Sequence, residues 1–122
     1  MAATIMIVED EAEIRDLVAA SLSVEGFRVL SAENADEALR LLDAHPEVDL
    51  VFTDIVMPGD HHGYDLAREV RARHPHMKLL YTSGYALGAA LRQNAPIEPA
   101  GMVAKPYRLD QLIGEIRRTL AA

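Results

Sequence analysis

Short apolar segments alternate along this chain with longer segments whose apolar residues recur at helical spacing. The short segments are brief enough to be buried strands, and the longer ones have the period of amphipathic helices. Strands that alternate with helices favour a parallel sheet with helices on both faces, because each parallel connection has to cross over the sheet. The strands are predicted at residues 4–8, 28–32, 50–53, 78–81 and 102–104.

Four of the intervening segments are predicted to be helices. Three cover residues 12–24, 64–73 and 108–120, and the fourth is capped by Asn34 and ends near His45. Gly26 is the expected stop after the first helix. A further helix at 87–94 is allowed, although Gly88 and the prolines at 96 and 99 restrict it. The face of the first helix that is expected to point inward carries Ile14, Leu17, Val18, Ser21 and Leu22.

The size and composition of the chain favour one domain that covers residues 1–122. The chain has 122 residues, half of them hydrophobic, which is enough to bury a core. A net charge of -7 without a basic patch argues against direct nucleic-acid binding. The sequence has no apolar run long enough for a transmembrane helix and no basic N-terminal stretch typical of a signal peptide. The absence of cysteine excludes disulfides and thiolate metal sites, and a cytoplasmic location fits these features.

Polar residues of reactive types follow four of the predicted strands. In a parallel sheet the carboxyl ends of all strands lie at one edge, where open α/β sheets bind their ligands. Carboxylates crowded at that edge repel one another unless a cation neutralises them. Oxygen ligands without nearby His or Cys favour Mg²⁺. The residues concerned are Glu9, Asp10, Glu11, Asp54, Thr82, Ser83 and Lys105.

Asp54 is the expected centre of the chemistry. A single carboxylate at the end of a buried strand is poorly placed for packing but well placed to react. With a divalent cation, the positive charge of Lys105 and the hydroxyl of Thr82, it would form a site for a transferring phosphoryl group. We therefore expect Asp54 to be a nucleophile that forms an aspartyl phosphate. Taken singly, Asp54 would be interpreted as a turn residue, Thr82 as a strand-end residue and Lys105 as a solvated charge.

Four motifs of the chain resemble the receiver domain of two-component response regulators. They are Val-Glu-Asp-Glu at 8–11, Asp-Ile-Val-Met-Pro-Gly at 54–59, Tyr-Thr-Ser-Gly at 81–84 and Lys-Pro-Tyr at 105–107. The resemblance covers essentially the whole chain. It implies an α/β fold of the flavodoxin-like, doubly wound (βα)5 type, with a five-stranded parallel sheet of order 2-1-3-4-5.

The resemblance also implies a signalling switch that is not an enzyme beyond assisting its own phosphorylation and dephosphorylation. Asp54 would take a phosphoryl group from a partner histidine kinase or histidine phosphotransfer protein, and the resulting conformational shift would control interactions with a downstream protein. The implied ligands of Mg²⁺ are Asp10, Asp54 and the backbone carbonyl of Val56, with Glu9 acting mainly through water.

The remaining implied roles concern how phosphorylation is detected. Lys105 would pair with Asp54 or with the phosphoryl group, Thr82 would hydrogen-bond a phosphoryl oxygen, and Ser83 would leave room for that group. The family usually has an aromatic residue three positions before the lysine, but this chain has Met102, which is flexible and has no hydroxyl. Tyr85 is our candidate for part of that aromatic role. The adjacent His61 and His62 lie in a polar loop and are interpreted as solvated.

The sequence leaves several alternatives open. We expect a stand-alone receiver, because the chain begins at Met1 and stops just past the closing helix, without room for a DNA-binding effector. A receiver excised from a hybrid histidine kinase and a pseudo-receiver that never takes phosphate are alternatives, and homodimerisation is undecided. An aspartyl-phosphate hydrolase would need an aspartate where this chain has Val56. A flavodoxin-like redox protein would place its flavin phosphate against the acids at 9–11, which would repel it.

Overall fold

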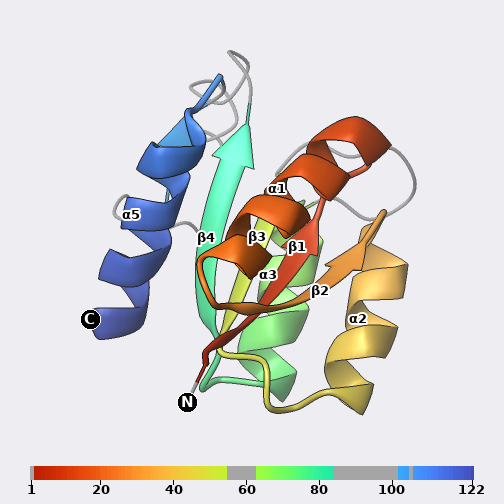
Figure 1. Cartoon of the computed structure of the whole chain (residues 1–122). Coiled ribbons are helices and arrows are strands. Elements are labelled where there is room, and N and C mark those ends of the chain that lie inside the picture. The colour runs from red at the N-terminus through yellow and green to blue at the C-terminus, as the bar shows by residue number, and fades with distance from the viewer. Residues whose placement is uncertain (1, 55–62, 84–101, 105) are drawn as a thin grey trace.

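A five-stranded parallel sheet lies between two layers of helices (Figure 1). The computed structural model describes residues 2–54, 63–83, 102–104 and 106–122. The strand order is β2-β1-β3-β4-β5, and all neighbouring strands are parallel, which confirms the predicted fold class and order. The strands are β1 (Thr4–Val8), β2 (Arg28–Ala32), β3 (Leu50–Asp54), β4 (Lys78–Ser83) and β5 (Met102–Ala104). The helices are α1 (Ala12–Val24), α2 (Ala35–Ala44), α3 (Gly63–Arg73) and α5 (Leu109–Ala121).

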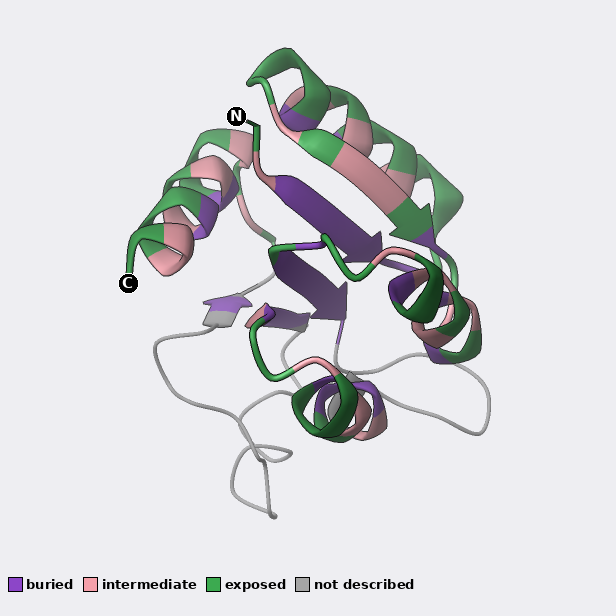
Figure 2. Ribbon diagram, turned by 90° about the horizontal axis from the view of Figure 1, so that it is seen from below, coloured by how far each residue is buried: buried purple, intermediate pink, exposed green. Residues whose placement is uncertain are grey.

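Helices cover both faces of the sheet. Successive strand residues point to opposite sides, so each central strand contributes to two cores. In β1, Ile5 and Ile7 belong to the core that α1 and α5 cover, whereas Met6 and Val8 belong to the core under α2 and α3. All four side chains are at most 1% exposed. Figure 2 shows the contrast between the buried central strands and the partly exposed edge strand β2. Burial on both faces explains why the apolar residues of the central strands are consecutive and do not alternate with polar ones, as in Ile5 to Val8 and Leu50 to Phe52.

The expected helix boundary signals form as the sequence predicts. Gly26 follows α1 with a φ of 96°. The backbone N–H of Phe27 donates to the carbonyl oxygen of Leu22 over 3.1 Å, the pattern of a Schellman motif. At the start of α2, the Asn34 side chain accepts a 2.8 Å hydrogen bond from the backbone N–H of Glu37. Both ends therefore satisfy backbone groups that a helix terminus would otherwise leave without partners.

Several details of the sequence prediction are wrong, and the bounds of α3 and α5 each differ from the prediction by one residue. Leu17 was expected to point inward, but it is 57% exposed, while Val18 and Leu22 are buried. At roughly 100° per residue, Leu17 lies about 120° around the helix from the midpoint of these two residues. The third and fourth strands also extend further than predicted, because Asp54 is the last residue of β3 and Thr82 lies within β4. Backbone pairing continues through these polar residues because it does not depend on apolar side chains.

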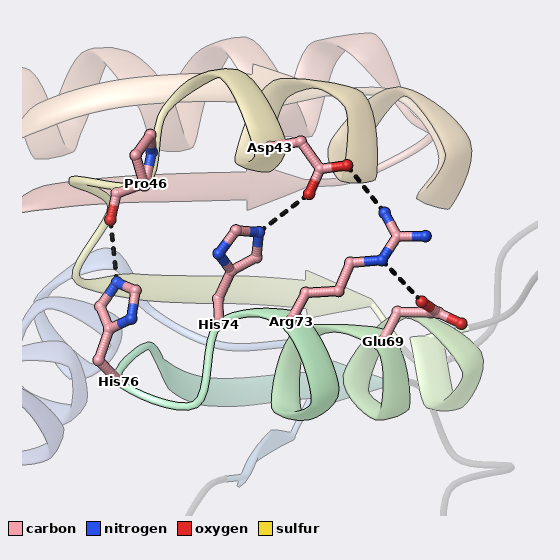
Figure 3. Close-up of polar contacts among 6 residues, drawn as sticks. All are labelled: Asp43, Pro46, Glu69, Arg73, His74 and His76. Atoms are coloured by element: carbon pink, nitrogen blue, oxygen red, sulfur yellow. Dashed lines mark hydrogen bonds and ion pairs between the residues drawn. The ribbon is translucent and has the colours of Figure 1, made fainter.

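Hydrogen bonds and ion pairs connect the carboxyl ends of α2 and α3 (Figure 3). The Asp43 carboxylate accepts from Arg73 Nη1 over 2.8 Å and contacts His74 Nε2 at 3.0 Å. Arg73 Nε also pairs with a Glu69 carboxylate oxygen at 3.0 Å. In a βα unit the helix runs back against the strand direction, so this network lies at the edge of the sheet opposite the carboxyl ends of the strands.

The predicted helix at 87–94 falls outside the residues that the structure describes, as does the segment with Pro96 and Pro99. Among the helices of the described ranges, none combines the length and apolar character needed to cross a membrane.

Candidate functional site

Three carboxylates meet at the carboxyl edge of the sheet. Glu9 and Asp10 follow β1, and Asp54 ends the neighbouring strand β3, whose Thr53 pairs with Val8. One carboxylate oxygen from each of the three acids lies within 4.8 Å of the others. Glu9 and Asp54 are 4% and 5% exposed, whereas Asp10 is exposed. The structure therefore confirms that the three acids predicted from the strand ends converge, and one of them, Asp10, is exposed to solvent.

This arrangement favours a bound cation. At an effective dielectric constant of about 20, two carboxylates about 5 Å apart repel each other by roughly 3 kcal/mol. A divalent ion would offset that repulsion, and an oxygen-only ligand set suits a hard ion such as Mg²⁺. Across the described parts of the chain, no other group of three or more acidic, histidine or cysteine residues could hold a metal ion in this way. The residues present therefore fit the predicted magnesium site.

Thr82 lies beside this cluster on the next strand. It is the register partner of Asp54 in the parallel pairing of β3 with β4. Thr82 is 1% exposed, and its hydroxyl has no hydrogen-bond partner within the described ranges. A buried hydroxyl without a partner costs about 1–3 kcal/mol. An incoming ligand oxygen could recover part of that cost by accepting from Thr82.

Thr53, which precedes Asp54 on β3, has a hydroxyl that is hydrogen-bonded. Its hydroxyl is also buried, but it donates to the backbone carbonyl oxygen of Asp54 over 3.0 Å. Two threonines on neighbouring strands therefore have different states, one satisfied by the backbone and one available to a ligand.

The backbone that presents Glu9 is held from two sides. Its N–H donates to the carbonyl oxygen of Ala32 at the end of β2 over 3.0 Å, and its carbonyl oxygen accepts from Arg15 Nη1 over 2.8 Å. Our sequence analysis missed Arg15. A signal for it exists, because long helical side chains lean towards the helix N-terminus, and Arg15 stands in the first turns of the helix that follows the acids.

Several predicted site residues lie outside the described residues. These are Val56, His61, His62, Tyr85 and Lys105. Ser83 and Met102 belong to β4 and β5, and the backbone of Met102 pairs in register with Tyr81, but their side chains also fall outside the description. Their roles therefore stay predictions.

The fold and the acidic site agree with the outcome of comparison with known protein families. Residues 5–117 match the model of the response regulator receiver domain. The chain belongs to this receiver domain family. This match confirms the resemblance seen in the four motifs. Receiver domains are signalling modules of two-component systems and are not typical enzymes.

Relatives of this receiver domain occur in two settings. It is 30% identical to the response regulator receiver protein CpdR of Brucella abortus over 118 residues, with 97% of each chain covered. It is 36% identical to the sensor kinase CckA of the same organism over 119 residues, but it spans only 12% of the length of that kinase. A crystal structure of a response regulator receiver protein from Sinorhizobium medicae is 30% identical, with a TM-score of 0.86 and coverage of 99% of this chain and 96% of that one.

Proposed function

We propose that Asp54 of this receiver domain accepts a phosphoryl group from a phosphohistidine on a partner kinase or phosphotransfer protein. The observation that supports this most directly is the meeting of Asp54 with Glu9 and Asp10 beside the buried hydroxyl of Thr82. The exposure of Asp10 leaves the cluster in contact with solvent, from which a phosphodonor would approach, and the burial of Asp54 limits access by water. Membership of a family that takes part in two-component signalling supports the same chemistry.

The proposed reaction is an in-line displacement at phosphorus. A carboxylate oxygen of Asp54 attacks the phosphorus atom, the new O–P bond forms, and the N–P bond of the phosphohistidine breaks. The imidazole nitrogen keeps the electron pair of the broken bond and takes up a proton. Charge develops on the equatorial phosphoryl oxygens during the transfer, so fixed positive charges and hydrogen-bond donors beside Asp54 lower the barrier.

The residues around Asp54 would supply these charges and donors. Mg²⁺, when bound, would neutralise the acids and the phosphoryl oxygens, with Asp10 and Asp54 as direct ligands and Glu9 acting through water. We further propose the carbonyl oxygen of Val56 as a ligand and Lys105 as the partner of the phosphoryl group. Both assignments come from the motifs at 54–59 and 105–107.

We propose that Thr82 links phosphorylation to a change of conformation. Its unsatisfied hydroxyl would gain an acceptor only when Asp54 carries a phosphoryl group, so the two states differ in one buried hydrogen bond. A ligand that interacts differently with two conformations shifts their populations. Because Met102 stands where the family usually has an aromatic residue, we propose Tyr85 as the neighbouring aromatic that responds to this movement. The output would be altered binding of a downstream protein.

We propose the same chemistry for a single receiver domain over residues 1–122 whether it acts alone, as in the setting of CpdR, or within a longer chain, as in the setting of CckA. The acidic cluster and Thr82 argue against a pseudo-receiver, since a module that never binds phosphate does not need a buried, unsatisfied hydroxyl beside three acids.

Intact-mass measurement tests this proposal. The protein is incubated with Mg²⁺ and acetyl phosphate, as wild type, as Asp54→Asn and as the control Asp16→Asn, which alters an exposed aspartate of α1 outside the cluster. We expect the wild type and the control to gain one phosphoryl group, Asp54→Asn to gain none, and EDTA to abolish the gain. No gain in the wild type, or an equal gain in Asp54→Asn, would refute the assignment of Asp54.

A further inference from the structure

Arg15 joins the loop that carries two of the acids to the body of α1. Its Nη1 donates to the backbone carbonyl oxygen of Glu9 over 2.8 Å, and its own backbone N–H donates to the carbonyl oxygen of Glu11 over 2.9 Å. The side chain is half-buried. Arg15 therefore spans the turn between β1 and α1, with its backbone in the helix and its guanidinium group on the last residue before Asp10.

The contact acts on the peptide unit that places Asp10. The Glu9 carbonyl group, the Asp10 N–H and the Asp10 Cα lie in one plane, so fixing the direction of the carbonyl fixes where the Asp10 Cα lies. The preceding peptide unit is held as well, because the Glu9 N–H donates to Ala32. The Glu9 side chain is held separately, since one of its carboxylate oxygens accepts from the backbone N–H of Glu11 over 3.3 Å. The side chain of Asp10 is exposed, so little packing holds it. The position of its carboxylate therefore depends mainly on its backbone.

We propose that Arg15 is a positioning residue for the divalent cation held by Glu9, Asp10 and Asp54. The proposal rests on the proposed function, because it assumes that these acids hold Mg²⁺. Arg15 is no ligand itself. It fixes the backbone from which two of the three acids extend.

Two effects of Arg15 on cation affinity oppose each other. Its positive charge repels a divalent cation, and its hydrogen bond keeps the acids in place. We expect positioning to prevail, because the charge is partly exposed to solvent and therefore screened. Loss of an outer-shell partner, in contrast, commonly weakens metal binding about 10- to 100-fold. The sign of the change in Mg²⁺ affinity when Arg15 is removed therefore separates the two effects.

Calorimetric titration of the full chain with Mg²⁺ alone tests this inference. Arg15→Met keeps a long side chain but loses the donor and the charge, and we expect its affinity for Mg²⁺ to fall about 10- to 100-fold. Arg15→Lys should recover most of the affinity, because a single carbonyl oxygen needs only one donor. The matched control is Arg40→Met on the exposed face of α2, outside the site, which should bind Mg²⁺ as the wild type does.

Phosphorylation by acetyl phosphate supplies a second measurement. In Arg15→Met the Mg²⁺ concentration that gives half-maximal rate should rise by the same factor as the calorimetric dissociation constant, with the rate at saturating Mg²⁺ retained. A purely structural role would lower the melting temperature in EDTA and leave the Mg²⁺ dependence unchanged. Should Arg15→Met give no cooperative melting transition, Arg15→Gln takes its place with the same expected weakening.

The outcomes separate this inference from the proposed function. If the wild type binds Mg²⁺ and Arg15→Met binds it equally well or more tightly, the positioning role of Arg15 is refuted while the function of the site stands. If the wild type neither binds Mg²⁺ nor gains a phosphoryl group, the proposed function fails, and the role of Arg15 fails with it.

Discussion

Replacing Thr82 with valine should make the protein more stable and a poorer phosphoacceptor. Thr82 is 1% exposed, and its hydroxyl oxygen has no hydrogen-bond partner among the residues of the described ranges. Valine has nearly the same shape and carries a methyl group in place of the hydroxyl. The substitution therefore removes an unsatisfied polar group without leaving a cavity.

The size of the gain follows from the cost of burying that hydroxyl. A buried donor or acceptor without a partner costs about 1–3 kcal/mol. We expect about 1–2 kcal/mol for Thr82, because the exposed Asp10 shows that solvent reaches the edge of the same acidic cluster. Unfolding entropy of about 2.1 cal/mol/K per residue corresponds to about 0.26 kcal/mol/K for a chain of this size. The melting temperature should therefore rise by about 4–8 °C.

Urea unfolding in EDTA measures this change without a metal ion. Thr53→Val is the matched control, because Thr53 is equally buried on the neighbouring strand but its hydroxyl donates to the Asp54 carbonyl oxygen. That variant loses a hydrogen bond that the native protein makes, so its free energy of unfolding should fall by about 0.5–1.5 kcal/mol. Replacing threonine with valine is thus expected to raise the free energy of unfolding at Thr82 and to lower it at Thr53 on the neighbouring strand.

The reasoning fails if Thr82→Val lowers the free energy of unfolding, or if both variants change stability in the same direction. The functional half is measured separately with acetyl phosphate and Mg²⁺. Thr82→Val should accept the phosphoryl group more slowly than the wild type or hold it less stably. An unchanged rate of phosphorylation together with an unchanged phosphoryl lifetime would contradict the proposed contact between Thr82 and the phosphoryl group.

Three further predictions concern stability and are checked by urea unfolding. Leu22→Ala, at a fully buried position of α1, should lose about 2–5 kcal/mol, whereas Leu17→Ala should lose less than about 1 kcal/mol; similar losses would contradict the burial pattern. Gly26→Ala should cost about 1–2 kcal/mol, because φ is 96° and the space around an added Cβ is open, so only the backbone is strained; a neutral result would argue against this end of α1. Asp43→Asn should cost about 0.5–1 kcal/mol, since its pairing with Arg73 is half-exposed, and the cost should shrink in about 1 M salt; a cost independent of salt would rule out an ionic origin.

The elements of the fold were predictable because their signals are local. Helix α1 has the predicted bounds, and the signals of Gly26 and Asn34 form as expected, since a glycine C-terminal stop and an asparagine cap act within a few residues of the helix end. The exposure of Leu17 could not be predicted from local signals. Its spacing allows an inward position, but which arc of the helix is buried depends on the sheet and on α5, against which α1 packs.

The candidate site was predictable in part for a similar reason. The sequence located the ends of β3 and β4 to within one or two residues, and the parallel order brings Glu9, Asp10 and Asp54 to one edge. The pairing of Asp54 with Thr82 depends on the register between β3 and β4, which is set by packing across the sheet. The lean of helical side chains towards the helix N-terminus places Arg15 near the acids, but no pattern of residue types specifies that its guanidinium group reaches the Glu9 carbonyl oxygen.

The sequence by itself determined the alternation of strands and helices and the chemical types at the strand ends. Both depend on periodicity and on residue identity, which are local properties of the chain. Tertiary structure alone decided that Asp54 and Thr82 are register partners, that Arg15 reaches the Glu9 carbonyl oxygen, and that Thr82 is buried without a hydrogen-bond partner in the described part of the chain. These contacts depend on which strands pair and in which register. The pairing and the register are set by the packing of apolar side chains on both faces of the sheet.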